Sequence, residues 1–160
     1  MESAIYETLY EKKEKILSQW QSAIFSSYAN ETIGQKKVSR FSNPIGYVIE
    51  KSSREIMEWL LNAENHGELA ASLEDICRLK AIQEFKPSEA LSFIFALKQI
   101  IREELKDEDG NNYWEIEMGY IDKKIDEIGL HAFDIYSEYR AKIYEIRMDE
   151  IKRMYGRDAG

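Results

Sequence analysis

The 160-residue sequence is poor in residues that interrupt helices and in residues that carry catalysis. Two prolines and eight glycines leave few points at which a long helix would have to end. A single cysteine, Cys77, excludes a disulfide within the chain and favours a reducing compartment. Only two histidines, His66 and His131, are available for a metal site or a histidine-based catalytic arrangement.

Positive charge is also scarce, because 22 Lys and Arg stand against 30 Asp and Glu, for a net charge of −8. Nucleic acids and anionic membranes are bound by clustered basic side chains, so neither is an expected partner. No apolar run is long enough to span a bilayer, and the acidic N-terminus lacks the apolar segment of a signal peptide. We therefore expect one cytoplasmic domain over residues 1–160, with a hydrophobic fraction of 44% that can form a core.

Apolar residues recur at steps of three and four, the spacing of amphipathic helices. The predicted helices cover residues 3–27, 44–63, 68–84, 87–105 and 114–155. Asn43 and Pro44 mark a helix start, because Asn caps free amides and Pro suits the first helical position. Residues 28–42 and 62–67 are predicted connections. The pattern predicts an all-α bundle of about five to six helices with a long C-terminal helix.

The last predicted helix has apolar residues on two faces. The first stripe is Ile121, Ile125, Ile128, Ala132, Ile135, Tyr139, Ile143 and Ile146. The second is Leu130, Phe133, Ser137, Tyr144, Met148, Ile151 and Tyr155. About forty residues span roughly 60 Å, more than the width of a small domain. Either both faces pack within one monomer or one of them meets a second subunit, and we favour a homodimer. The candidate dimer contacts are Ile121, Ile125, Ile128, Ile135, Tyr139, Ile143 and Ile146.

Motifs that carry catalytic or metal chemistry are missing. The sequence has no H-E-x-x-H, no C-x-x-C, no Gly-rich phosphate loop and no G-x-S-x-G turn. A catalytic arrangement assembled in space would have only two histidines to use. We therefore expect a protein that is not an enzyme and that holds no metal.

Six segments share a pattern with a known family: RFSNPIG (40–46), ICRLKAIQ (76–83), FKPSEA (85–90), FIFALK (93–98), AFDIY (132–136) and RAKIY (140–144). Together and in this order they resemble the RsbRD amino-terminal domain family, related to the sensory domains of RsbT co-antagonist proteins. Trp20 and Tyr28 fit the pattern of its first helix. The resemblance covers nearly the whole chain.

The resemblance implies a bacterial signalling domain with a globin-like helical fold, without haem, that dimerises through its last two helices. In related stressosome proteins this domain is coupled to a STAS domain that meets a kinase. No STAS segment follows by residue 160, so we expect a stand-alone sensory or scaffold protein with an unknown signalling partner. The alternative is a sensor that binds a small ligand or haem. Residues 68–84, the helix below a globin-like haem pocket, contain no histidine to serve as axial ligand, so we expect no cofactor.

Polar residues near these segments are candidates for a ligand site or a polar core: Arg78, Lys80, Gln83, Asp134, Tyr136 and Arg140. Arg78 and Lys80 are two residues apart, so only one of them can face the core of a helical bundle. Since a buried charge needs a partner, we expect Asp134 to pair with Arg78 or Arg140. These groups either form buried structural contacts or line a pocket for a small anionic ligand.

Overall fold

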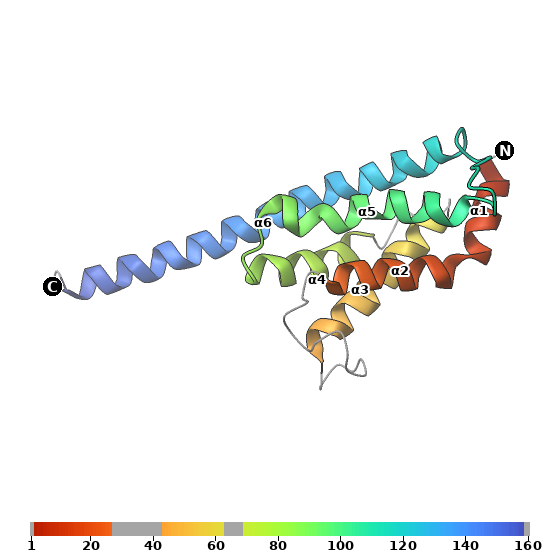
Figure 1. The fold of residues 1–160 in the computed structure, drawn as a ribbon. Coiled ribbons are helices and arrows are strands. Elements are labelled where there is room, and N and C mark those ends of the chain that lie inside the picture. The colour runs from red at the N-terminus through yellow and green to blue at the C-terminus, as the bar shows by residue number, and fades with distance from the viewer. Residues whose placement is uncertain (1, 27–42, 63–68, 159–160) are drawn as a thin grey trace.

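The computed structural model describes residues 2–26, 43–62 and 69–158. Within these residues the chain forms six α-helices and no strand: α1 (Glu2–Glu11), α2 (Lys13–Ser26), α3 (Pro44–Leu61), α4 (Leu69–Ile82), α5 (Pro87–Leu105) and α6 (Met118–Asp158). Figure 1 shows α2 to α6 side by side in a bundle, with α6 much longer than the others. The all-α prediction with a long C-terminal helix is confirmed. The predicted connection at 28–42, and most of that at 62–67, lie outside the described residues.

The core lies between helices that pack against one another in pairs. Helix α6 packs against α4 and α5, α2 packs against α3 and α5, and α3 packs against α4. Trp20 of α2 is fully buried, and its ring stacks on that of Phe93 in α5 with centroids 6.0 Å apart. Its indole N–H donates to the Phe93 carbonyl at 2.7 Å. The largest core side chain therefore adds apolar area without leaving a buried donor unsatisfied.

The start of α3 follows the predicted capping chemistry. The Asn43 side chain accepts a hydrogen bond from the Gly46 amide at 3.0 Å, and Pro44 is the first helical residue. Gly46 is needed at this close approach, because a Cβ atom there would lie 2.5 Å from the Asn43 side chain.

The predicted single helix over 3–27 is wrong, because the chain breaks at Lys12 into α1 and α2. The Lys12 ammonium donates to the Glu104 carbonyl at the end of α5, at 2.8 Å. The last carbonyls of a helix have no partner within the helix, so Lys12 satisfies one of them and ties the bend to α5. Lys12 and Lys13 are charged residues between the buried apolar positions Leu9 and Ile16, and the break between α1 and α2 lies at this point.

The end of α4 is a left-handed turn. The Phe85 amide donates to the Lys80 carbonyl at 3.3 Å, and the Glu84 amide donates to the Ala81 carbonyl at 3.1 Å. Glu84 has a φ of 64°, a conformation usually taken by glycine at this position. Its carboxylate pairs with Arg147 of α6, which connects the turn to the far part of that helix.

The long helix α6 runs unbroken through Gly119 and Gly129 and begins at Met118, since residues 113–117 form turns. Two ion pairs fix its outer side to α5: Arg102 with Asp122 at 2.5 Å, and Lys98 with Asp126 at 2.6 Å. Figure 1 shows its C-terminal part leaving the bundle, and every side chain from Tyr144 to Gly156 is exposed. No helix in the described segments is long and apolar enough to cross a membrane.

The first apolar stripe of α6 faces the core of its own chain. Ile121, Ile125 and Ile128 are fully buried there, so their predicted role as dimer contacts is wrong. Ile135, Tyr139 and Ile143 are partly buried against the same core. Among the predicted contacts only Ile146 is largely exposed, at 58%.

Candidate functional site

A cluster of polar side chains surrounds the turn between α4 and α5. Lys80, on the last turn of α4, is only 2% exposed. Its ammonium nitrogen lies 4.8 Å from the centre of the Phe85 ring and 5.3 Å from that of Phe93, so two aromatic faces stabilise the cation. A lysine buried to this degree is uncommon and is a candidate for a functional role.

Burial changes the proton affinities in this cluster. It lowers the pKa of Lys80 from an ordinary 10.5 to about 8, because the charged ammonium loses hydration. It raises the pKa of the neighbouring Cys77 thiol to about 12. The thiol is buried and donates to the Ala132 carbonyl of α6 at 3.8 Å. Cys77 is therefore a packed, unreactive thiol and not a nucleophile.

Two side chains of α6 hold the same turn. The Tyr136 hydroxyl donates to the Phe85 carbonyl, and Arg140 donates to the Ala81 carbonyl at 3.4 Å. Burial raises the pKa of Tyr136, which keeps its phenol protonated and able to donate. Together with Lys80, these residues gather at one place in the fold, and each contacts the α4–α5 turn.

The other predicted polar residues lie outside this cluster or at its edge. Arg78 is exposed and pairs with Asp75 on its own helix, 3.2 Å away, while Lys80 takes the buried position. Asp134 is exposed on α6, so the predicted pairing of Asp134 with Arg78 or Arg140 is wrong. Gln83 is half-buried within the turn itself.

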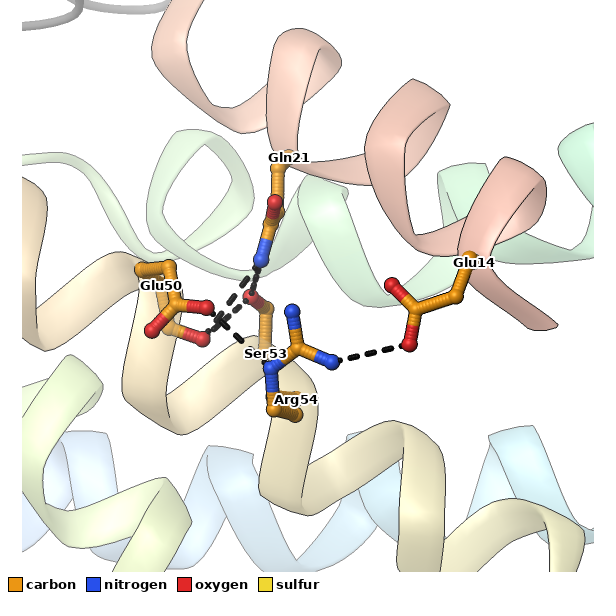
Figure 2. Close-up of polar contacts among 5 residues, drawn as sticks. All are labelled: Glu14, Gln21, Glu50, Ser53 and Arg54. Atoms are coloured by element: carbon orange, nitrogen blue, oxygen red, sulfur yellow. Dashed lines mark hydrogen bonds and ion pairs between the residues drawn. The ribbon is translucent and has the colours of Figure 1, made fainter.

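A second polar network joins α2 to α3. Figure 2 shows Glu14 and Gln21 reaching from α2 to three residues of α3. Gln21 donates to the Ser53 hydroxyl at 2.9 Å, and Arg54 bridges Glu50 at 3.1 Å and Glu14 at 3.0 Å. Hydrogen bonds with these two carboxylates raise the pKa of Arg54. Ser53 donates to the Glu50 carbonyl and accepts from Gln21, so its hydroxyl is engaged in contacts that join α2 to α3.

Two surface clefts lie near α3. One, of about 300 Å³, is lined by Tyr10, Lys13, Glu58, Leu61 and Asn62. The other, of about 370 Å³, is lined by Pro44, Tyr47, Val48, Lys51, Asp75 and Arg78. The only predicted polar residue at either cleft is Arg78, whose guanidinium is already paired. Within the described segments, no three His, Cys, Asp or Glu side chains are grouped so that they could hold a metal ion.

The most prominent exposed feature is the outer face of α6. We name it the outer seam: Leu130, Phe133, Ser137, Ala141, Tyr144, Met148, Ile151 and Tyr155. Its large members are exposed by 36–72%, and Phe95 of α5, 46% exposed, covers Gly129 beside it. At about 100° per residue this seam points away from the buried stripe of the same helix. A contiguous apolar face of this kind is typical of an interaction surface.

The family model of the RsbT co-antagonist protein rsbRD N-terminal domain matches residues 14–150 of this sequence. The chain belongs to this family. The match begins in α2 and covers the α4–α5 turn, the polar cluster around it and α6 as far as the bundle extends. Neither the curated proteins nor the solved structures that were compared gave a match. As an rsbRD N-terminal domain, the chain is a member of a family of regulatory sensor domains.

The sequence alone missed two features of this rsbRD N-terminal domain. Glu84 and Arg147 form the link between the turn and the far part of α6, and Arg147 could have been recognised because it lies seven residues after Arg140, on the same helix side. The aromatic surroundings of Lys80 depend on Phe93 of α5, and no local pattern pairs these two residues.

Proposed function

We propose that this protein is a non-enzymatic, cytoplasmic sensory or regulatory domain that acts by protein–protein interaction and pairs with a second copy through the outer seam of α6. Family membership supports the regulatory role. The observation that carries the pairing is the exposed apolar face that continues past the end of the bundle, where no other element of the described chain covers it. Exposed apolar area of this extent gains free energy when a partner removes it from water.

The proposal is tested by measuring mass in solution by light scattering over a range of concentrations. We expect a dimer for the wild type and a monomer for Ile151→Glu, because a charge in the seam would have to be desolvated on pairing. Ile146→Glu is the matched control. It places the same charge on another exposed isoleucine, 58% exposed against 46% for Ile151 and about 140° around the helix from it.

Two results would count against the proposal. A wild type that stays monomeric at high concentration removes self-association. A dimer that Ile146→Glu breaks and Ile151→Glu does not would move the contact to the other face of α6. Helical content measured by circular dichroism must be unchanged in both variants, so that loss of the dimer is not loss of the fold.

A further inference from the structure

The connection between α5 and α6 carries a second exposed apolar patch, at the end of the bundle opposite to the free part of α6 (Figure 1). Ile116 is 86% exposed, more than any other large apolar side chain in the described segments. Tyr113 and Tyr120 are 77% and 50% exposed. We name these three residues the connection patch. We propose that it binds a basic, amphipathic segment of a different protein, in which lysine or arginine side chains flank an apolar stripe.

The side chains of the connection patch lie on one side of a helical turn. The Met118 amide donates to the Trp114 carbonyl at 2.8 Å, so the chain already turns as a helix before α6 begins. Met118 is fully buried, and Trp114 packs against the core. Tyr113, Ile116 and Tyr120 follow one another at steps of three and four, so they are neighbours on the side that faces solvent.

Hydrogen bonds within the connection fix its shape. The Asp107 carboxylate accepts from the Asn111 amide at 2.8 Å and from the Asp109 amide at 3.0 Å. The Asp107 amide in turn donates to the Asn111 carbonyl at 2.8 Å. The Trp114 amide donates to the side-chain oxygen of Asn112 at 2.8 Å. A partner therefore meets a backbone that is already ordered, which lowers the entropic cost of binding.

Negative charge surrounds the connection patch and favours a basic partner. Residues 106–120 carry five carboxylates and one lysine, a net charge of −4 and half of that of the whole chain. The lysine, Lys106, is already paired with Glu103 at 2.8 Å. Glu108 and Glu115 are exposed and make no ion pair within the described segments. Lysine or arginine side chains of a partner would therefore meet a complementary potential beside exposed aromatic and aliphatic side chains.

The same charges argue against other occupants of the connection patch. A second copy of this chain would bring its own carboxylates to face these. Nucleic acid and anionic lipid would be repelled. Within the part of the chain that the structure describes, no three acidic side chains are placed to hold a metal ion. The inference thus gives the chemistry of a partner for the proposed regulatory domain, and it does not depend on pairing through the outer seam.

Two synthetic helical peptides serve as probes, one with leucine along one face and lysine elsewhere, the other with glutamate in place of every lysine. Each carries a fluorescent label, and its binding to the intact protein is measured by fluorescence anisotropy at low salt. We expect the leucine–lysine peptide to bind and the leucine–glutamate peptide not to bind. Ile116→Ser should raise the dissociation constant at least several-fold, because it removes the central apolar contact. Ile82→Ser, at an isoleucine of α4 that is 63% exposed, is the matched control and should leave the constant unchanged.

Charge reversal tests the electrostatic part of the proposal. Glu108→Lys combined with Glu115→Lys should raise the dissociation constant of the leucine–lysine peptide at least several-fold. Asp149→Lys combined with Glu150→Lys changes the net charge by the same amount on the exposed part of α6 and should have little effect. Equal losses in the two double variants would show unspecific attraction to an acidic protein and would overturn the proposal.

Binding of both peptides, binding of neither, or binding that Ile116→Ser leaves unchanged would also overturn it. An affinity that falls in Ile151→Glu and not in Ile116→Ser would place the peptide on the outer seam instead. Circular dichroism must show the same helical content in all variants. Light scattering on the same samples reports self-association separately. A monomer that binds the peptide through Ile116 contradicts only the pairing of two copies, and a dimer that binds no peptide contradicts only this inference.

Discussion

Replacing Lys80 with methionine should change how the stability of this protein depends on pH. Lys80→Met keeps an unbranched side chain of similar length between the rings of Phe85 and Phe93 and removes the charge. The buried ammonium is costly in the folded state, since burial lowers its pKa to about 8 from 10.5. The variant does not bear that cost at any pH.

The sign follows from proton binding in the two states. The unfolded chain holds the Lys80 proton up to about pH 10.5, whereas the folded chain releases it near pH 8. Unfolding therefore takes up a proton at Lys80 between these values, and the contribution of Lys80 to the free energy of unfolding of the wild type rises with pH through this window. A pKa difference of about 2.5 corresponds to roughly 3 kcal/mol, of which about 2 kcal/mol is recovered between about pH 7 and about pH 9.5.

The measurement is urea unfolding followed by circular dichroism at both pH values, for the wild type and for Lys80→Met. We expect the advantage of the variant to be about 2 kcal/mol smaller at the higher pH, because other titrating groups contribute equally to both proteins. Cys77 stays protonated in the folded state, where burial raises its pKa to about 12, and its titration in the unfolded chain contributes equally to the wild type and the variant. Lys123→Met, at an exposed lysine of α6, supplies the baseline. A difference between Lys80→Met and wild type that is the same at both pH values would refute this reasoning.

Two further predictions concern helix packing and capping. A Cβ atom at Gly129 would lie 2.7 Å from the Phe95 ring. Alanine is favoured over glycine within a helix, so Gly129→Ala should raise the free energy of unfolding by about 1 kcal/mol in a Phe95→Ala background, where that ring is absent. In the wild-type background the clash with Phe95 should remove this gain. Thermal unfolding of the four proteins of this double-mutant cycle measures the coupling, and strict additivity would contradict it. Asn43→Ala should lower the free energy of unfolding by about 1 kcal/mol, because the Gly46 amide loses its acceptor. Asn43→Asp keeps an acceptor and should lose less in the same denaturation assay, so equal losses would show that the cap is not the cause.

Features set by neighbouring residues could be predicted from the sequence. The start of α3 depends on Asn43, Pro44 and a glycine two positions further on, all within one helical turn. A similar local argument applies to Arg78 and Lys80, since two residues two apart on a helix cannot both face the core. That argument predicted one buried and one exposed side chain, but it did not identify which of Arg78 and Lys80 is buried. The structure assigns the buried position to Lys80 because Phe85 and Phe93 lie there.

Contacts between distant elements could not be predicted in the same way. Asp134 lies between two apolar residues, which suggested partial burial, but the helix turns it towards solvent beside the outer seam. The break at Lys12 depends on a carbonyl at the end of α5, 92 residues away. The globin-like character of the bundle, which the family resemblance implies, stays a prediction.

The two stripes of α6 show why the dimer face could not be chosen from the sequence and how the structure narrows the choice. Both stripes are apolar, and periodicity alone gives no reason to assign the core to either. The first stripe packs inside the bundle as far as Ile143, and beyond Ile146 its positions become charged, at Glu150 and Arg153. The outer seam keeps Met148, Ile151 and Tyr155 over the same distance. Beyond Ile146 the apolar residues other than Met154 thus lie on the face that the described bundle does not cover, which is the pattern expected if their partner lies along the outside of α6.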